Sequence, residues 1–259
     1  MTKADRIAEA LAADWARRAD YRSLAGDLAP ADAEEAYAAQ DALRARHART
    51  RGAPAGRKIA LTSRAMQEMV GVDRPAFGIL FAGDLHESPA EIPAAAFNRL
   101  GLEVELALSP AEDVPPRAAP WRAEEVPALL GAVRPAFELI EDRSADYGAL
   151  DVLTLIADNA WCGGAVLGPE IPGWRGLDLD ALPATLTQTG AAPERTTTGA
   201  AAPLASFAAV LTHFGARGET LRAGEIVITG SAARTRFPAP GDAVRYEIDG
   251  LAAVDLRVT

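Results

Sequence analysis

The sequence is poor in the residues that build disulfides and cysteine-rich metal sites. Its 259 residues include one cysteine, Cys162, and three histidines, His47, His86 and His213. One thiol cannot form an internal disulfide, and it excludes a zinc site built from several cysteines. No two histidines have the spacing of a metal-ligand pair, and no serine or cysteine lies in a nucleophile motif. Nucleophilic catalysis by a Ser-His-Asp or Cys-His set is therefore poorly supported.

Positive charge and long apolar runs are also scarce. The 26 basic residues are outnumbered by 36 acidic ones, which gives a formal net charge of −10. A nucleic-acid-binding protein would usually show a basic face, so this balance argues against that class. No run approaches the roughly 20 apolar residues of a membrane helix, and Met1–Ala13 lacks the layout of a signal peptide. Together with the single cysteine, these features predict a cytoplasmic protein without membrane or nucleic-acid partners.

Glycine-rich nucleotide-binding motifs are absent as well, since the sequence contains neither GxGxxG nor a P-loop. It begins instead with helical patterns over residues 2–18 and about 30–49. Strand patterns dominate the last two thirds, without regular β-α alternation. We expect strands over 58–62, 77–81, 102–108, 135–140, 165–167, 226–230, 244–248 and 253–258, and helices over 64–70, 121–130, 151–160 and 203–217. The pattern predicts an α+β fold, with an α-rich region over 1–75 and a β-rich domain over 76–259.

One stretch, Leu102–Leu108, alternates strictly between apolar residues and Glu103, Glu105 and Ala107. A two-residue period predicts a β-strand, because successive side chains of a strand point to opposite faces. The two carboxylates then share one face, with Cα atoms roughly 6.5 Å apart. Such a face can be a solvated acidic surface, since many strands have one wet side. It can also be part of a metal site.

A third carboxylate, Glu138, lies inside the apolar run Pro135–Ile140. An ionised carboxylate is costly to bury unless it is paired, hydrogen-bonded or bound to a metal. A nearby arginine, Arg134 or Arg143, could pair with it. Alternatively, it could be the third oxygen ligand beside the two glutamates of the preceding strand. Three carboxylates with few other polar groups suit Mg²⁺ or Mn²⁺.

Other polar positions stand at the ends of apolar strands. Lys58 begins a strand beside a glycine loop, and Asp84 follows a strand and a glycine. Thr229–Ser231 follows a buried strand and offers backbone and hydroxyl donors to an anion. Each position also has a structural interpretation, as a solvated lysine, a turn aspartate and a strand-ending turn.

Several of these segments occur in one order along the chain. They are Gly56–Ser63 around Lys58, Gly78–Asp84, Glu103–Glu105, Pro135–Glu138, Ile156–Gly168, Leu221–Ser231 and Pro240–Asp242. Together they resemble the family of 2-keto-4-pentenoate hydratases and 4-oxalocrotonate decarboxylases, which belongs to the wider fumarylacetoacetase-like fold. The resemblance extends from about Ala36 to Val258. Two departures concern the substrate more than the metal: Glu141 stands where aspartate is frequent, and Ala202 stands where asparagine or histidine is frequent.

The resemblance implies a β-rich fumarylacetoacetase-like catalytic domain and a divalent metal, Mg²⁺ or Mn²⁺, held by Glu103, Glu105 and Glu138. A 2-oxo acid would bind the metal through its carboxylate and keto oxygens. Lys58 and Asp84 are the candidate proton-handling pair, with a lysine pKa lowered by burial or neighbouring cations. The matching segments imply further substrate-binding positions: Thr62, Asn159, Thr229, Gly230 and Ser231.

The expected reaction is metal-dependent addition of water to a 2-hydroxy-2,4-dienoate in aromatic meta-cleavage catabolism. Decarboxylation of a 2-oxo-3-enedioate is the alternative, and it would need a cation for the distal carboxylate, such as Arg64 or Arg99. Hydrolysis of an acylpyruvate would use a histidine, for which only His86 lies near a motif. A non-catalytic scaffold subunit is the fourth interpretation. The resemblance also implies a homo-oligomer and a complex with other enzymes of the pathway.

Overall fold

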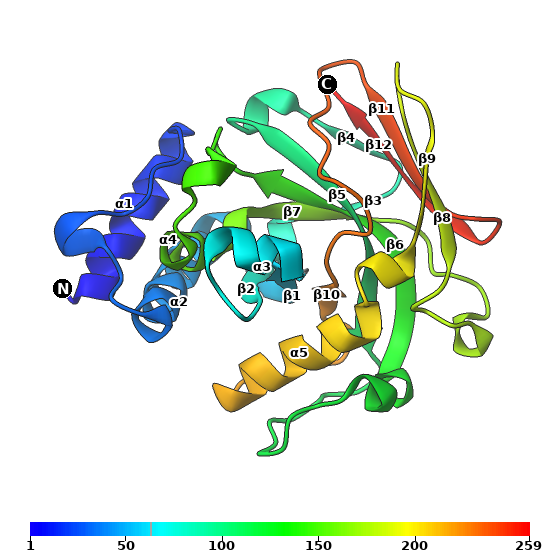
Figure 1. Cartoon of the computed structure of the whole chain (residues 1–259), viewed down its shortest axis with the longest axis horizontal. Coiled ribbons are helices and arrows are strands. Elements are labelled where there is room, and N and C mark those ends of the chain that lie inside the picture. The colour runs from blue at the N-terminus through cyan, green and yellow to red at the C-terminus, as the bar shows by residue number, and fades with distance from the viewer. Residues whose placement is uncertain (63) are drawn as a thin grey trace.

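The computed structural model of the chain describes residues 1–62 and 64–259. Ser63, the last residue of the lysine motif, lies outside the described residues. The two N-terminal helices lie toward one end of the molecule, and the strands of a second sheet lie toward the opposite end (Figure 1). The α-helices are α1 (Lys3–Arg17), α2 (Ala33–Arg51), α3 (Arg64–Val70), α4 (Val152–Ala157) and α5 (Pro203–Ala216).

Two sheets contain the described strands. The seven-stranded sheet has the order β2-β1-β10-β5-β6-β7-β3, and the five-stranded sheet has the order β4-β12-β11-β8-β9. The first consists of β1 (Pro54–Ala60), β2 (Ala76–Phe81), β3 (Leu85–Glu87), β5 (Leu100–Pro110), β6 (Leu130–Glu141), β7 (Cys162–Leu167) and β10 (Ile226–Ile228). The second consists of β4 (Ala90–Ile92), β8 (Pro183–Gln188), β9 (Glu194–Thr197), β11 (Ala243–Ile248) and β12 (Ala252–Val258).

The first strand belongs to the same sheet as the strands of the second half of the chain. β1 pairs parallel with β10 and antiparallel with β2. It begins at Pro54, inside the segment expected to be a glycine loop, and ends before Leu61, whose φ is +57°. The N-terminal 75 residues are thus α-rich but contribute one strand to the central sheet. That strand is the one that bears Lys58.

Most of the expected elements are present, and the differences have local causes. The segment 121–130 contains a 3₁₀-helix over Ala123–Ala128 in place of the expected α-helix. Pro127 lies inside it, and a proline lacks the N–H that an α-helix needs at an interior position. The short strands β3, β4, β8 and β9 were not expected. The first two have only three residues each and pair with strands distant in sequence, whereas β8 and β9 pair with each other.

The helix α5 is the most apolar element of the fold. The segment Thr198–Ala216, which contains it, is long and apolar enough to cross a membrane by length and composition alone. In the fold 44% of the apolar 18-residue stretch within this segment is buried, and the buried side chains include Phe207, Leu211 and Phe214. A core helix of a globular domain has the same composition. Packing against the core therefore accounts for its apolar character.

Two histidines pack among aromatic rings; His47 is buried and His213 is partly buried. His47 contacts the rings of Trp15 and Phe81 edge-on, at centroid distances of 5.4 and 5.8 Å. His213 stacks on Phe77 at 4.1 Å. Burial, assisted by neighbouring arginines, lowers the pKa of His47 to about 3 and that of His213 to about 4. Both rings are therefore neutral in the folded protein at pH values where an unfolded chain already protonates them.

These histidines should make the fold sensitive to acid. Both folded-state pKa values lie below the unfolded value of about 6.5. The contribution of the two histidines to the free energy of unfolding is therefore complete above pH 6.5 and is lost as the pH falls toward 3 to 4. At pH 5.5 each histidine should lower the free energy of unfolding by about 1.4 kcal/mol relative to neutral pH. We expect the variant His47→Leu/His213→Phe to lose about 3 kcal/mol less unfolding free energy than the wild type between pH 7.5 and 5.5 in urea titrations. His86→Gln, at a partly exposed histidine, is the control variant. If the double variant loses as much unfolding free energy as the wild type between pH 7.5 and 5.5, the assignment of the two histidines is wrong.

Candidate metal centre

The pairing of β5 with β6 brings the three candidate glutamates together. In this antiparallel pair Glu103 lies directly opposite Glu138, and Glu105 lies two residues further along the same face of β5. One carboxylate oxygen from each lies within 4.8 Å of the other two. The two glutamates of the alternating strand and the isolated glutamate of β6 therefore form one cluster.

Most of the cluster is buried, and several of its carboxylate oxygens have no hydrogen-bond partner among the described residues. Glu105 is 1% exposed and Glu138 is fully buried, whereas Glu103 is partly exposed. In the described part of the chain, Oε1 of Glu105 and both carboxylate oxygens of Glu138 have no hydrogen-bond partner. Burial and the neighbouring carboxylates raise the pKa of Glu105 well above its usual value. Orphaned carboxylate oxygens that converge on one point fit a divalent cation with oxygen preference, Mg²⁺ or Mn²⁺.

The remaining oxygens of the cluster are held by the segment that follows β10. The backbone N–H of Gly230 donates to Oε2 of Glu105 at 2.7 Å, and the Thr235 hydroxyl donates to Oε1 of Glu103 at 2.6 Å. Gly230 has a φ of +93°, and a Cβ there would lie 2.8 Å from the Thr62 methyl group. A glycine is therefore required for this turn to present its N–H to Glu105. Such supporting bonds orient metal ligands.

Lys58 reaches the cluster from β1. Its Nζ lies 2.8 Å from Oε1 of Glu138 as an ion pair, with an orientation outside hydrogen-bond geometry, and it donates to the Ala160 carbonyl at 3.0 Å. Gly78 is its cross-strand neighbour, and a Cβ there would lie 3.0 Å from the lysine side chain. The absent side chain at position 78 leaves the space that Lys58 occupies.

The pKa values of this pair follow from burial and charge. Burial raises the pKa of Glu138 to about 7, although Lys58 opposes the rise. Burial alone would lower the pKa of Lys58, as expected from the sequence, but the carboxylates of Glu138 and Glu103 outweigh it and raise this pKa. With the protein groups alone, Lys58 is an ammonium ion held against its counter-ion.

A left-handed turn places the Ala160 carbonyl beside Lys58. Asn159, Ala160 and Trp161 have φ values of +55°, +48° and +58°, a conformation that non-glycine residues rarely adopt in succession. The Asn159 side chain accepts from the Ile79 N–H at 2.8 Å and donates to the Ile79 carbonyl at 2.9 Å. Asn159, expected to bind substrate, therefore ties this turn to β2. The sequence reasoning missed the turn because no glycine marks it.

Asp84 has a different partner from the one expected. Its carboxylate accepts from Nε of Arg51 at 2.7 Å, and Nη2 of the same arginine donates to the Cys162 carbonyl at 3.0 Å. Burial raises the pKa of Asp84, against the lowering effect of Arg51. Lys58 pairs with Glu138 instead. Nothing in the sequence indicated that Arg51, the last residue of helix α2, would turn toward this site.

The other expected substrate-binding residues lie close to the cluster and have structural bonds. The buried Thr229 hydroxyl donates to the Leu106 carbonyl at 3.0 Å. The Ser231 hydroxyl accepts from the Val104 N–H at 3.2 Å and donates to the Ala233 carbonyl at 2.8 Å. These bonds attach the segment after β10 to strand β5, on which two of the glutamates lie.

The arginines considered as partners of Glu138 are occupied elsewhere. Arg143 forms an ion pair with the buried Asp158 at 2.5 Å, whose other oxygen accepts from Nε1 of Trp15 at 2.6 Å. Arg134 pairs with Glu87 at the surface. Among the described residues, Lys58 takes the place of the expected arginine as the cation that forms an ion pair with Glu138.

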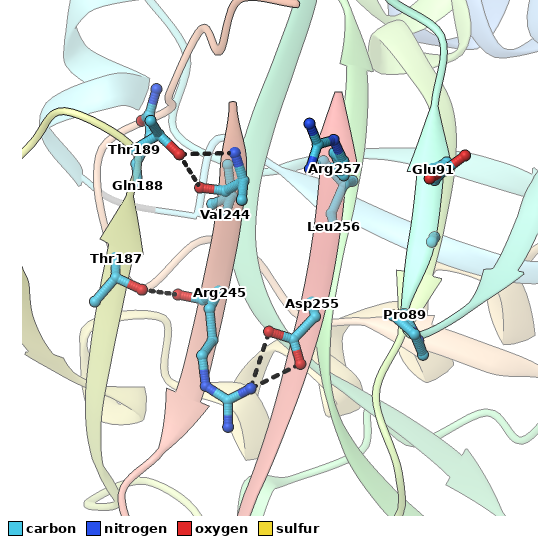
Figure 2. Close-up of a pocket in the computed structure, with 12 residues that line it drawn as sticks. Pro89, Glu91, Thr187, Gln188, Thr189, Val244, Arg245, Asp255, Leu256 and Arg257 are labelled. Atoms are coloured by element: carbon cyan, nitrogen blue, oxygen red, sulfur yellow. Dashed lines mark hydrogen bonds and ion pairs between the residues drawn. The ribbon is translucent and has the colours of Figure 1, made fainter. Parts of the chain in front are cut away.

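A large groove lies apart from the acidic cluster. It has a volume of about 730 Å³ and crosses the five-stranded sheet over β8, β11, β12 and the β4 edge (Figure 2). Arg245 and Asp255 in this groove pair with each other at 2.7 Å. None of its lining residues belongs to the acidic cluster or donates to it. The buried carboxylates, rather than this groove, carry the chemistry of a candidate site.

Comparison with known proteins agrees with the geometry. The family described as "Fumarylacetoacetate (FAA) hydrolase C-terminal" matches residues 84–259. The chain belongs to this family. It is 33% identical over 225 residues to a 2-keto-4-pentenoate hydratase of Paraburkholderia xenovorans (strain LB400), which covers 85% of this chain and 82% of the relative. It is 26% identical to a 4-oxalocrotonate decarboxylase of Pseudomonas putida, over 92% of this chain and 90% of the relative.

A solved structure shows the same fold. The 4-oxalocrotonate decarboxylase from Pseudomonas putida G7, complexed with magnesium and adipate, superposes with a TM-score of 0.89 at 24% identity, covering 100% of this chain and 99% of that chain. The expected family and the α+β fumarylacetoacetase-like fold are confirmed. Relatives that are hydratases, at 33% identity, support the assignment of this chain as an enzyme of the hydro-lyase class. That solved structure contains magnesium, and the glutamate cluster of this chain offers three carboxylates that could hold a metal ion.

Proposed function

We propose that this protein is a metal-dependent hydratase that adds water to a 2-hydroxy-2,4-dienoate and forms a 4-hydroxy-2-oxo acid in aromatic meta-cleavage catabolism. One observation carries the proposal. Three convergent carboxylates, two of which have oxygens without a hydrogen-bond partner in the described part of the chain, lie beside a buried lysine ammonium, Lys58. This set combines a site for a Lewis acid with a group that can move a proton, and both are needed to protonate and hydrate a dienol.

Glu103, Glu105 and Glu138 would hold Mg²⁺ or Mn²⁺. When bound, the cation supplies Lewis-acid stabilisation of negative charge on the oxygen of a 2-oxo acid. The partial exposure of Glu103 leaves an open side, while the other two glutamates are closed off from solvent. A small 2-oxo acid would approach the cluster from that side.

Lys58 would transfer protons to and from the carbon atoms of the substrate. The 2-hydroxydienoate loses its enol proton and gains one at C5, which gives a 2-oxo-3-enoate; water then adds its hydroxyl to C4 and its proton to C3. Lys58 would give and recover protons in these steps, because its Nζ is fixed between Glu138 and the Ala160 carbonyl. Asp84 would act through Arg51, which joins it to the strand that adjoins β6. Folded, metal-loaded Lys58→Ala and Asp84→Ala variants that turn over normally would refute these two roles.

The substrate-binding roles of Thr62, Asn159, Thr229, Gly230 and Ser231 also remain part of the proposal. Gly230 acts on Glu105 through its N–H, and Thr62 covers that glycine. The bonds of Asn159, Thr229 and Ser231 to neighbouring backbone groups favour a positioning role over direct contact with the substrate.

The alternative is decarboxylation of a 2-oxo-3-enedioate such as 4-oxalocrotonate. A decarboxylase relative at 26% identity supports it, and a hydratase relative at 33% favours the hydratase. Acylpyruvate hydrolysis has weaker support, because no hydrogen bond or ion pair joins His86 to the three glutamates in the described part of the chain. A scaffold without catalysis would not need the buried Lys58–Glu138 pair. We further propose a cytoplasmic homo-oligomer that associates with neighbouring enzymes of the pathway.

An ultraviolet assay with enzymatically generated 2-hydroxypenta-2,4-dienoate tests the function. We expect loss of the dienol absorbance with Mg²⁺ or Mn²⁺, formation of 4-hydroxy-2-oxopentanoate, and no turnover with a chelator. Carbon dioxide released from 2-oxo-3-hexenedioate, without hydration of the dienol, would move the assignment to the decarboxylase. Inactivity on both with metal bound would point to acylpyruvates, and inactivity without bound metal would point to the scaffold.

A further inference from the structure

The acidic cluster opens toward one aromatic side chain. Gly101 lies on the same face of β5 as Glu103, and a Cβ there would lie 3.2 Å from the Thr235 methyl group and 3.4 Å from the Phe237 ring. The Thr235 hydroxyl donates directly to Glu103. Phe237 is 46% exposed. An apolar ring thus lies over Gly101, two residues from Glu103 on the same face of β5.

A neutralised arginine supports this ring. The Arg99 guanidinium lies 4.8 Å from the Phe237 ring centroid. Its Nε and Nη2 donate to the two carboxylate oxygens of Asp142 at 2.8 and 2.5 Å, and Nη2 also donates to the Ala145 carbonyl at 3.1 Å. Asp142 is fully buried and also accepts from the Tyr147 hydroxyl at 3.0 Å. The bidentate pair cancels the charge of Arg99 where a substrate would meet it.

The other cationic side chains considered for this site are also bound in ion pairs. Arg64 pairs with Glu68 at 2.7 Å, and its side chain is 89% exposed. Lys58 is paired with Glu138, and Arg51 with Asp84. Beside Phe237, a second carboxylate on the substrate would meet an aromatic ring and a neutral ion pair, while Arg236 of the same segment pairs with Glu194 and Arg234 is exposed. Placing a carboxylate there without a partner is unfavourable.

We propose that Phe237 and the Arg99–Asp142 pair line the part of the site that receives the end of the substrate remote from its 2-oxo acid group, and that they select an uncharged, apolar end over a second carboxylate. This inference rests on the proposed function, since it assigns a substrate class to the same site. Phe237 supplies apolar contact, and Asp142 prevents Arg99 from attracting a distal anion.

Binding of two saturated six-carbon acids to the Mg²⁺-loaded protein tests this selectivity without turnover. 2-Oxohexanoate and 2-oxoadipate differ only in a methyl group or a carboxylate at the sixth carbon. By isothermal titration calorimetry we expect 2-oxohexanoate to bind at least 10-fold more tightly. Phe237→Lys should shift the affinity ratio at least 10-fold toward 2-oxoadipate, because it places a cation beside the distal end. Asp142→Asn should tighten 2-oxoadipate about 10-fold by releasing Arg99.

Leu251→Lys is the matched control, because Leu251 is also an exposed large hydrophobic residue, in the turn between β11 and β12. It should leave the affinity ratio unchanged. Equal or tighter binding of 2-oxoadipate by the wild type, or the same shift in both lysine variants, would overturn the inference. Selective binding of 2-oxohexanoate by a protein that hydrates no dienoate would overturn the proposed function and leave the selectivity standing. No binding of either acid would overturn both.

Discussion

Replacing Glu105 by glutamine should lower the affinity for Mg²⁺ at least 100-fold and reduce kcat/KM by a similar factor at subsaturating metal. A glutamine keeps an oxygen that can accept from the Gly230 N–H, now 2.7 Å from the carboxylate. It puts a neutral amide in place of the unpartnered Oε1. The cation site therefore loses one negative charge while the backbone around it is preserved, and the charge of the ligand set strongly affects divalent-cation affinity.

The same substitution should act on stability in the opposite direction. Because burial and like charge raise the pKa of Glu105, its ionised carboxylate destabilises the chain without metal, and Glu105→Gln should unfold at a higher temperature than the wild type in chelator. With Mg²⁺ at 100 times its Kd, the wild type should gain about 2.7 kcal/mol and the variant almost nothing. Calorimetric titration and thermal unfolding with and without Mg²⁺ measure both effects.

Glu91→Gln is the control for the loss of one negative charge, because Glu91 is an exposed strand glutamate of β4. It should bind Mg²⁺ like the wild type and show the same stabilisation by the metal. If Glu105→Gln retains wild-type Mg²⁺ affinity, or if chelator destabilises it as much as the wild type, the assignment of Glu105 as a ligand is wrong.

Lys58→Met should abolish most of the turnover and leave the metal in place. The lysine is 2% exposed, and methionine fills most of its volume without the ammonium that contacts Glu138 and the Ala160 carbonyl. Loss of a general acid–base group typically costs 10²- to 10⁴-fold in rate, and we expect a decrease of kcat in that range. Mg²⁺ affinity should be equal or higher, since the cation no longer competes with an ammonium for Glu138. Steady-state kinetics at saturating Mg²⁺, with metal content measured on the same samples, separates the two effects.

Removal of a surface lysine from an ion pair of equal length provides the control. Lys3 and Glu35 also lie 2.8 Å apart, but both are about 30% exposed, so Lys3→Met should change neither kcat nor metal content. A folded Lys58→Met variant with wild-type kcat would show that Lys58 only compensates the charge of Glu138. Loss of metal together with activity would instead make Lys58 a structural support of the cation site.

Much of the site could be predicted because its signals are local. The alternation around Glu103 and Glu105 marks a strand with two carboxylates on one face, and a glutamate isolated in an apolar run marks a costly buried charge. Both features are properties of a few consecutive residues. The left-handed turn at Asn159–Trp161 could not be found in this way, because its conformation is held by bonds to β2 rather than favoured by glycine.

The sequence by itself determined the kinds of residue in the site, the order of the motifs and hence the family. Only the tertiary structure decided how the charges are paired: Lys58 with Glu138, Arg51 with Asp84, and Arg99 with Asp142. The members of these pairs lie 80, 33 and 43 residues apart, and an ion pair requires a separation of a few ångströms that the sequence does not encode locally. The register that sets Glu103 opposite Glu138 is likewise a property of the folded sheet, and a shift by one residue would turn one of these side chains to the other face.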